Sequence, residues 1–586
     1  MKRYIICLAV SLGLLTALNG CKGMLDEVNY GNPTIEDMMT NEENVTLLVG
    51  QAYAELKWVH DHWGYWGVAS LTADECICPV RNPDENWADG GYWKKLNTHQ
   101  WNEFADAFKN IWNSTISGAV LCNKLINTLN DYEASMDSVV YSEYIGELEV
   151  LRSYYYYLLF DCFGRIPYLE EYVDRTEKLY APQEVWSALV ACLERNAPHM
   201  KAVDDTNRSQ LYGRTSQGFA YALLARLYLN AESYGCTPSN IFKRADCTEP
   251  SGNGYTAISS VQDFYTNAVR CCDQVIESGS YSIEDDFFAN FKIDNSASHE
   301  NIFVIVEDGS ADFDLRYSGS MSNKLRITLL THHYCFQTAY GMIEKPWNGF
   351  CARPAFLDRY HSRDVRGPGD EGLGTQDTHQ WGWFVGPICD ANGNQLKDEN
   401  NTPAIVTREL NLYLDPGTGK ASSTDPLMNC DWNSGARLNK YELDKAGKYA
   451  YTENDFVLFR YADVLWMKEE ALLRGGQGTS GFNSADFKTL KARSFAYDQG
   501  EVTYAQAYPD VLTLDGILDE RGREFAWENV RRRDLIRYGK FGDASYVQYV
   551  ASDDAKWNWF PIPYSVLEKS LKDESGQPYW TQNEGY

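Results

Sequence analysis

Helical periodicity over residues 42–278 is the feature that most restricts how this chain can fold. In the stretch 43–56 the apolar positions fall three and four residues apart. The same spacing returns at 107–129, 144–163, 216–234 and 261–278. Each segment predicts an amphipathic helix of roughly four to six turns, whose apolar face must pack on a neighbour. Antiparallel helix pairs, stacked one on the next, are therefore the expected architecture.

Small residues alternate with large ones in the segment 218–229, which reads GFAYALLARLYL. This mixture lets a neighbouring helix approach closely. The alternation of small and aromatic residues resembles degenerate tetratricopeptide repeats, although the period is not strict. We therefore predict a mainly α fold built of tetratricopeptide-type helix pairs.

The pattern changes between residues 281 and 454. Short apolar runs such as 301–306, NIFVIV, are separated there by segments rich in Gly, Asn, Asp and Pro, which predicts long irregular loops with a few short strands. Helical spacing returns at 456–474, 514–538 and, briefly, 563–570. Loops of this length inside a compact domain usually carry function.

The first 21 residues have the form of an export signal. Two basic residues precede the apolar run 4–18, which is too short to span a bilayer comfortably. The tetrad Leu18-Asn19-Gly20-Cys21 resembles a bacterial lipoprotein box, in which the cysteine carries the lipid after cleavage. We expect removal of residues 1–20 and a lipid anchor on Cys21. Ordinary secretion with an unmodified Cys21 is the alternative.

Three units follow from these patterns: a signal peptide at 1–20, a helical region at 21–280 that contains an aromatic loop at 60–102, and a region at 281–586. The last is loop-rich over 281–454 and helical over 455–586. A mature chain of this length is expected to form either two domains or one elaborated scaffold. Of these we predict that the two larger regions pack as one globular unit.

Charge and cysteine content narrow the function classes. With 53 basic and 82 acidic residues the net charge is −29, which repels phosphate backbones and argues against nucleic acid as a partner. Of the 15 cysteines, 13 remain once Cys7 leaves with the signal and Cys21 is assigned to lipid. An odd number argues against a dense disulfide framework. No zinc-type spacing accompanies Cys76 and Cys78, so no metal is expected.

Five ordered motifs carry a family resemblance. They are LRSYYYY at 151–157 followed by FGRIP at 163–167, RYADVLWMKEEA at 460–471, ERGREFAWE at 520–528, PIP at 561–563 and QNEGY at 582–586. With these motifs the chain resembles, nearly end to end, the SusD/RagB family of surface glycan-binding lipoproteins from Bacteroidetes nutrient-uptake systems. The motifs themselves predict structure, because tyrosine rings suit a core and Arg523, Glu524 and Glu528 can pair across helices.

The loop 60–102 is the most aromatic irregular segment. The flat apolar face of a pyranose stacks on indole rings, while its hydroxyls bond to short polar groups. In glycan-binding members of the family, a loop resembling this one supplies part of the binding platform. By that resemblance we assign Arg81, Trp87, Asp89 and Trp93 to the site. In the alternative, each tryptophan packs its own loop onto the helices.

The central region contributes the other wall in the resembled family, and there we assign His333, Tyr334, Trp347 and Trp383. Zinc is not expected at the pair 332–333, since neighbouring side chains on a strand point to opposite faces. The segment 390–394 faintly resembles a calcium loop but lacks its turn glycine, which favours a polar hairpin turn.

Searches for catalytic sequence motifs find no nucleophile elbow, zinc-protease helix, phosphate loop or dinucleotide fingerprint. We therefore predict a non-catalytic protein without cofactor, lipid-anchored at the surface of the outer membrane. By resemblance it captures an oligosaccharide and delivers it to a TonB-dependent, SusC-like transporter. A peptide ligand, as in RagB-like members, and a surface glycoside hydrolase are the alternatives.

Overall fold

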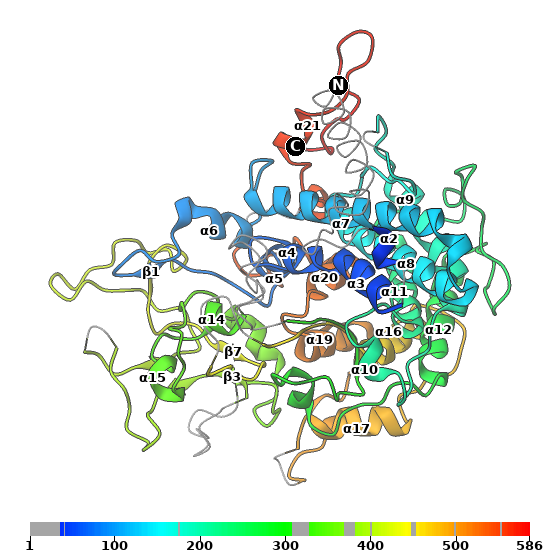
Figure 1. The fold of residues 1–586 in the computed structure, drawn as a ribbon. Coiled ribbons are helices and arrows are strands. Elements are labelled where there is room, and N and C mark those ends of the chain that lie inside the picture. The colour runs from blue at the N-terminus through cyan, green and yellow to red at the C-terminus, as the bar shows by residue number, and fades with distance from the viewer. Residues whose placement is uncertain are drawn as a thin grey trace, which may run out of the picture.

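Helices dominate the computed structural model, as predicted (Figure 1). The model describes residues 35–39, 42–173, 176–307, 327–368, 381–398, 401–446, 453–496, 500–550 and 554–586. The signal segment and Cys21 lie outside the described residues. Within these ranges no helix is both long enough and apolar enough to cross a membrane.

The principal helices form a closed circuit of neighbours. In chain order they are α4 (Glu55–Val59), α5 (Tyr65–Leu71), α7 (Asp106–Asp131), α8 (Ser138–Phe163), α9 (Pro182–Asn196), α11 (Gln217–Leu229), α12 (Val261–Glu277), α16 (Tyr461–Leu473), α19 (Leu514–Glu524) and α20 (Arg531–Arg537). Each of α7 to α20 packs on the next, α20 packs on α5, and α5 packs on α7. Helices from both ends of the sequence therefore complete one scaffold.

The other helical elements are short. They are α2 (Ile35–Met38), α3 (Glu42–Gly50), α6 (Tyr92–Asn97), α10 (Arg208–Leu211), α14 (Ile327–Thr331), α15 (Phe336–Tyr340), α17 (Ala485–Arg493), α18 (Tyr504–Ala507) and α21 (Tyr564–Leu567), with 3-10 turns η1 (Gln51–Tyr53), η2 (Asp89–Gly91), η3 (Glu133–Ser135), η4 (Ala197–His199), η5 (Glu232–Tyr234), η6 (Phe287–Phe291), η7 (Pro354–Arg359) and η8 (Ala555–Asn558).

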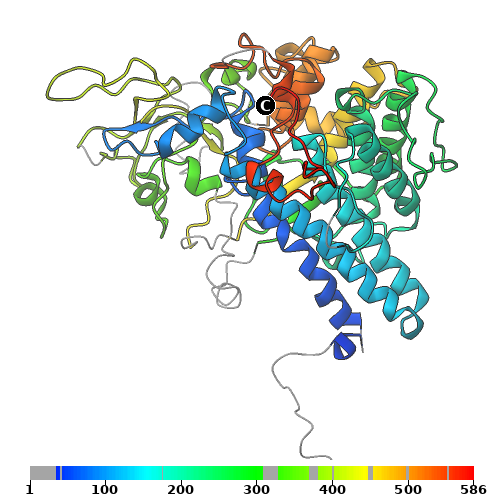
Figure 2. The same ribbon diagram turned by 90° about the horizontal axis from the view of Figure 1, so that it is seen from above.

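The strands of the described ranges form two-stranded sheets. Parallel β1 (Arg81–Asn82) pairs with β6 (Cys430–Asp431), and the antiparallel pairs are β2 (Asn301–Ile305) with β8 (Phe456–Arg460), β3 (Gly382–Phe384) with β7 (Arg437–Asn439), and β4 (Gly386–Pro387) with β5 (Ile405–Val406). In Figures 1 and 2 the long helices gather on one side, and β1 and α6 lie on the other side among the loops of the central region. The aromatic loop is thus built into a part of the molecule far from it in sequence.

Three predicted helices differ from the structure, because each is divided or begins as a strand. The first five residues of the segment 456–474 form strand β8, because β2 pairs with this run of aromatic and aliphatic residues before α16 begins. The segment 514–538 is two helices, α19 and α20, separated where Trp527 and Asn529 adopt positive φ angles of 63° and 67°. The stretch 43–56 is likewise divided by η1.

Four of the five family motifs lie largely in the core, as predicted, whereas QNEGY at 582–586 is mostly exposed or half-buried. Tyr154 to Tyr157 are at most 2% exposed. Arg460 donates to Glu524 Oε1 at 2.9 Å and to Glu528 Oε2 at 2.8 Å, joining the start of α16 to the end of α19. Burial alone would raise the pKa of Glu524, but Arg493, Arg460 and Arg366 together hold it well below its usual value. Arg523, by contrast, pairs within its own helix, with Glu520 at 2.8 Å.

Cysteine packing and the 390–394 turn also follow the sequence. The 13 cysteines of the described residues are free thiols, and all but Cys389 are buried. Asp390 Oδ1 accepts hydrogen bonds from the backbone N–H groups of Asn392 and Asn394, both at 2.9 Å, and an isolated bridge joins Cys389 to Gln395. This geometry is the expected polar hairpin turn.

Candidate functional site

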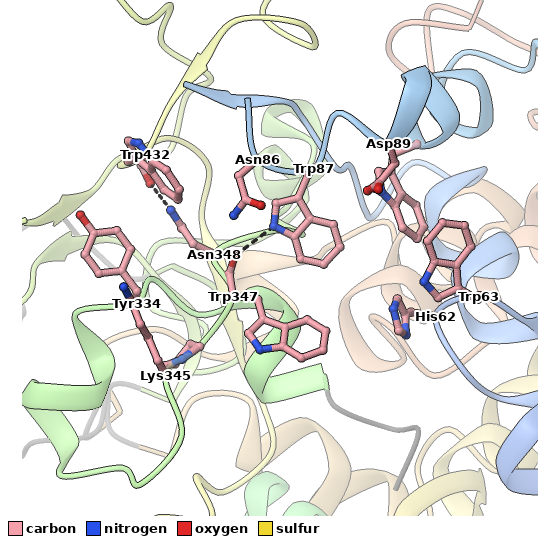
Figure 3. A pocket seen from close by; sticks show the side chains of 12 residues that line it. His62, Trp63, Asn86, Trp87, Asp89, Tyr334, Lys345, Trp347, Asn348 and Trp432 are labelled. Carbon is pink, nitrogen blue, oxygen red and sulfur yellow. Dashed lines mark hydrogen bonds between the residues drawn. The ribbon is translucent and has the colours of Figure 1, made fainter. Parts of the chain in front are cut away.

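A pocket of about 480 Å³ opens where the aromatic loop meets the central region (Figure 3). It is lined by His62, Trp63, Asn86, Trp87, Asp89, Trp93, Tyr334, Lys345, Pro346, Trp347, Asn348 and Trp432. Six of these side chains are tryptophan or tyrosine. The cavity has the size of a small-molecule site, and its walls mix rings with a few polar groups.

One end of the pocket is a cluster of indoles from the N-terminal half. Trp63 follows α4, and its ring lies 4.6 Å from Trp93 and 4.7 Å from Tyr92, centroid to centroid. Trp93 is only 1% exposed, and its Nε1–H donates to Asp89 Oδ2 at 2.7 Å. Trp93 therefore supports its neighbours, and the more open ring of Trp63 offers the larger face to a ligand.

Trp87 joins this cluster to the central region. Its Nε1–H donates to the carbonyl of Trp347 at 2.9 Å, and its ring lies 5.8 Å from Trp93 and 6.3 Å from Trp347. The backbone of Trp87 has a φ of 67°, which a bulky residue rarely adopts. Gly349 lies under the ring, because a Cβ there would stand 2.4 Å from Trp87 Cε2. The absent side chain at Gly349 thus makes room for the indole.

The other end of the pocket belongs to the central region. Tyr334 and Trp432 meet edge to face with centroids 5.6 Å apart, and Lys345 Nζ lies 4.7 Å from the centroid of the Tyr334 ring. Asn348 Nδ2 donates to the carbonyl of Trp432 at 3.0 Å, which fixes the two segments together. In Figure 3 Tyr334, Lys345 and Trp432 lie on the opposite side of Trp87 from His62, Trp63 and Asp89.

Few ionisable side chains line the pocket. Asp89 is the one carboxylate among the lining residues that the structure describes, and a glycosidase needs two on either side of the scissile bond. His62 Nδ1 lies within hydrogen-bond distance of Oδ1 of its neighbour Asp61. Across the described ranges no group of three or more His, Cys, Asp or Glu side chains is arranged to hold a metal ion.

Five of the eight residues assigned from the sequence line this pocket: Trp87, Asp89, Trp93, Tyr334 and Trp347. The other three lie behind its walls or in the core. Arg81 is fully buried and donates to the carbonyls of Gly349, Asp431 and Ser434. His333 is buried behind Tyr334, and Trp383 packs edge to face on Trp527 with centroids 5.6 Å apart.

Sequence reasoning did not assign His62, Trp63, Asn86, Lys345, Asn348 or Trp432 to the site. A signal existed for two of them. Trp63 belongs to the same aromatic loop, and Trp432 stands between Asp431 and Asn433 in a polar stretch like that around Trp87. The sequence did not reveal that β1 pairs with β6, and this pairing brings Trp432 to the pocket.

Comparisons with known proteins agree with this fold. The model of the SusD family matches residues 313–586, and a model described as "Starch-binding associating with outer membrane" matches residues 67–229. The starch-binding protein SusD of Bacteroides thetaiotaomicron is 25% identical over 469 residues, which cover 75% of this chain and 72% of that protein.

Solved structures show the same architecture. Surface glycan-binding protein A from Bacteroides thetaiotaomicron superposes with a TM-score of 0.65 at 18% identity, covering 93% of this chain and 100% of that one. The complex of that protein with laminarihexaose superposes with a TM-score of 0.62 at 18% identity, covering 92% of this chain and 99% of that one. The protein of the same name from Bacteroides fluxus superposes with a TM-score of 0.62 at 19% identity, covering 93% of this chain and 100% of that one. From the two family models, the curated relative and the shared fold, the chain belongs to the SusD family.

Proposed function

We propose that this protein binds an oligosaccharide in the aromatic pocket at the outer surface of the outer membrane and delivers it to a TonB-dependent, SusC-like transporter. The observation that carries the proposal is the pocket itself. Half-buried indoles of Trp63, Trp87, Trp347 and Trp432 surround a cavity that also exposes amide, carboxylate and ammonium groups. A pyranose needs this combination, because its ring faces are apolar and its edges carry hydroxyls.

The relatives support the same ligand class. One relative is named for starch, and a solved structure of the same fold is a complex with laminarihexaose. The lipid anchor on Cys21 and the transporter partner rest on the sequence motif and on the family. An anchor with several acyl chains would hold the protein at the membrane, with each buried methylene contributing about 0.8 kcal/mol.

We further propose that the protein does not cleave its ligand. Asp89 is engaged by the indole N–H of Trp93, and the described lining offers no second carboxylate opposite it. Incubating the purified protein with any glycan that it binds should release no new reducing ends. Release that disappears in Asp89→Asn would overturn this part of the proposal.

The binding proposal is tested by titrating a panel of oligosaccharides and peptides into the wild type and Trp347→Ala. Loss of a central aromatic contact should weaken glycan binding by about 1–3 kcal/mol. Phe104→Ala is the matched control, since this ring is 63% exposed and does not line the pocket. Binding of peptides alone would contradict the glycan proposal and favour the peptide alternative.

The anchor is tested separately. Cys21→Ala should move the protein from the membrane fraction to the soluble fraction, with glycan affinity unchanged. Unaltered fractionation of this variant would reject the lipid on Cys21.

A further inference from the structure

Two buried arginines lie directly behind the pocket wall. Arg81 donates to the carbonyls of Gly349 at 2.9 Å, Ser434 at 2.5 Å and Asp431 at 3.2 Å. Arg437 donates to the carbonyls of Ser434 at 3.0 Å, Trp432 at 3.3 Å and Phe350 at 3.4 Å. Both guanidinium groups therefore sit beneath the two segments that carry Trp347, Asn348 and Trp432 into the pocket.

Neither arginine forms a direct ion pair with a carboxylate of the described residues, although Asp431 lies close enough to act on the charge of both. Among the described residues, no carboxylate oxygen lies within 4.0 Å of the guanidinium nitrogens of Arg81 or Arg437. Backbone carbonyls accept hydrogen bonds from the terminal nitrogens of both groups but bring no net charge, and the Nε of each arginine is buried without a hydrogen-bond partner among the described residues. Burial, followed by the charge of Arg81, lowers the pKa of Arg437 only to about 9, so the group remains protonated at neutral pH. Both positive charges thus persist in a region of low dielectric, where their field reaches further than it would in water, and the carboxylate of Asp431 offsets part of them.

Lys345 adds a third cation on the pocket wall itself, beside the ring of Tyr334. The same end of the pocket shows the summed effect of these charges on His333, which lies behind Tyr334. Burial first, and then Arg437, Arg81 and Lys345, lower the pKa of its imidazole well below the usual value. The positive charges of Arg81, Arg437 and Lys345 therefore all act on the His333 side chain, at the Tyr334 end of the pocket.

The carboxylates near the pocket are distributed differently from the three cations. Asp431 acts on both Arg81 and Arg437 and offsets part of their charge, and its Oδ1 also accepts from Asn433 N at 2.9 Å and from Ser434 Oγ at 2.8 Å. Asp89 lines the opposite end, away from Lys345 (Figure 3). Asp84 and Glu85 are exposed, where solvent ions screen them. The pocket is thus polarised, with a cationic end at Tyr334, Lys345 and Trp432.

Resting on the proposed function, we propose that the ligand is an acidic oligosaccharide whose carboxylate or sulfate group lies at the Lys345 end of the pocket. A chain with a net charge of −29 repels anionic polymers in general, so a locally positive pocket gives selectivity for an acidic group placed at that point. At the other end Asp89 accepts hydrogen bonds from sugar hydroxyls. The charge arrangement therefore also orients the ligand.

The test uses pairs of oligosaccharides that differ only in charge: uronate oligomers against the same oligomers with carboxyls reduced to alcohols, and sulfated oligomers against their desulfated forms. Affinities are measured by calorimetry at low and at high ionic strength. For at least one pair, the acidic member should bind about tenfold more tightly than its neutral partner, because hydrogen bonds to charged groups are the stronger ones. The advantage should shrink as salt rises.

Three variants locate the acidic group. Lys345→Gln should abolish most of the preference, and Lys345→Arg should keep it. Lys95→Gln is the control, because it removes a lysine charge from an exposed position on α6 that does not line the pocket. This variant should retain the preference for the acidic ligand. If neutral and acidic partners bind equally, the acidic class is wrong while glycan binding stands. If the preference survives Lys345→Gln, the acidic group lies elsewhere. If no oligosaccharide of either kind binds, the proposed function itself fails.

Discussion

The helical scaffold and the loop-built pocket both bury arginines, but they neutralise them in different ways. Arg460 and Arg493 in the scaffold meet the carboxylates of Glu300 and Glu524 at 2.5–3.1 Å. Arg81 and Arg437 at the pocket donate to backbone carbonyls, and Arg81 also to Cys430 Sγ, and neither forms an ion pair with a carboxylate of the described residues. The first arrangement closes on itself and holds helices together. The second joins the loops that form the pocket.

Breaking the scaffold network should give the largest effect. Arg460→Met leaves Glu300, Glu524 and Glu528 buried without one of their cations, which should lower the free energy of unfolding by about 3–5 kcal/mol. Chemical denaturation measures it. Lys178→Ala is the control, since its pair with Glu184 is exposed and should contribute at most about 0.5 kcal/mol. Equal losses in the two variants would mean that the network is not the main source of stability.

Two tryptophans of the central region should have opposite effects on stability and on glycan affinity when they are replaced. Trp383 is fully buried against Trp527, so Trp383→Ala should cost about 3–5 kcal/mol of stability and leave glycan affinity unchanged in the folded protein. Trp347→Ala should do the reverse, losing affinity with little change in melting temperature. Thermal denaturation and calorimetry on the same two proteins make the comparison. Early melting of Trp347→Ala with normal binding would move the platform away from Trp347.

The seam between the two regions should respond to pH. Burial, only partly offset by a hydrogen bond from Trp527 N, raises the pKa of Glu75 to about 8. The folded state therefore keeps a proton that the unfolded state releases near its ordinary pKa of about 4.5. The contribution of this group to the free energy of unfolding is fully present below that pH and is lost as pH rises through about 8, by roughly 4–5 kcal/mol.

Denaturation midpoints measured across this range should fall with pH in the wild type and fall less steeply in Glu75→Gln. Since the amide keeps the shape but cannot ionise, the difference between the two slopes isolates Glu75. Parallel slopes would show that Glu75 is ionised in the folded protein.

The smallest effect concerns the support beneath Trp87. Gly349→Ala places a methyl group where the indole lies and should weaken glycan binding by about 1 kcal/mol, because the ring must move. Gly50→Ala is the control, since Gly50 has a φ of −54° and no atom within 4 Å of an added Cβ. Wild-type affinity in Gly349→Ala would show that the position of Trp87 does not matter for binding.

Much of the scaffold was predictable. The segments 107–129, 144–163 and 261–278 agree with α7, α8 and α12 to within a few residues, apart from the start of α8 at Ser138. Periodicity is a local property, so it survives in the sequence without knowledge of partners. The boundary at 456–461 was not predictable in this way, because pairing with a distant strand overrode the local pattern.

The candidate site was predictable in part. Residue type and loop context identified Trp87, Asp89, Tyr334 and Trp347 as pocket residues, together with the supporting Trp93. The same reasoning selected Trp383 and Arg81, which are fully buried away from the cavity. A tryptophan in a polar loop has the same sequence signature whether its ring faces solvent or the core.

The sequence by itself determined the helices, the buried tyrosine and charge motifs and the family, because each depends on spacing along a short stretch of chain. Only the tertiary structure decided which rings form one pocket. That choice depends on contacts such as Arg81 with Ser434, which are 353 residues apart and join the aromatic loop to the loop of Trp432. Side chains from distant parts of the sequence form one pocket only where their segments come together in space. The packing of the whole molecule decides which segments do so.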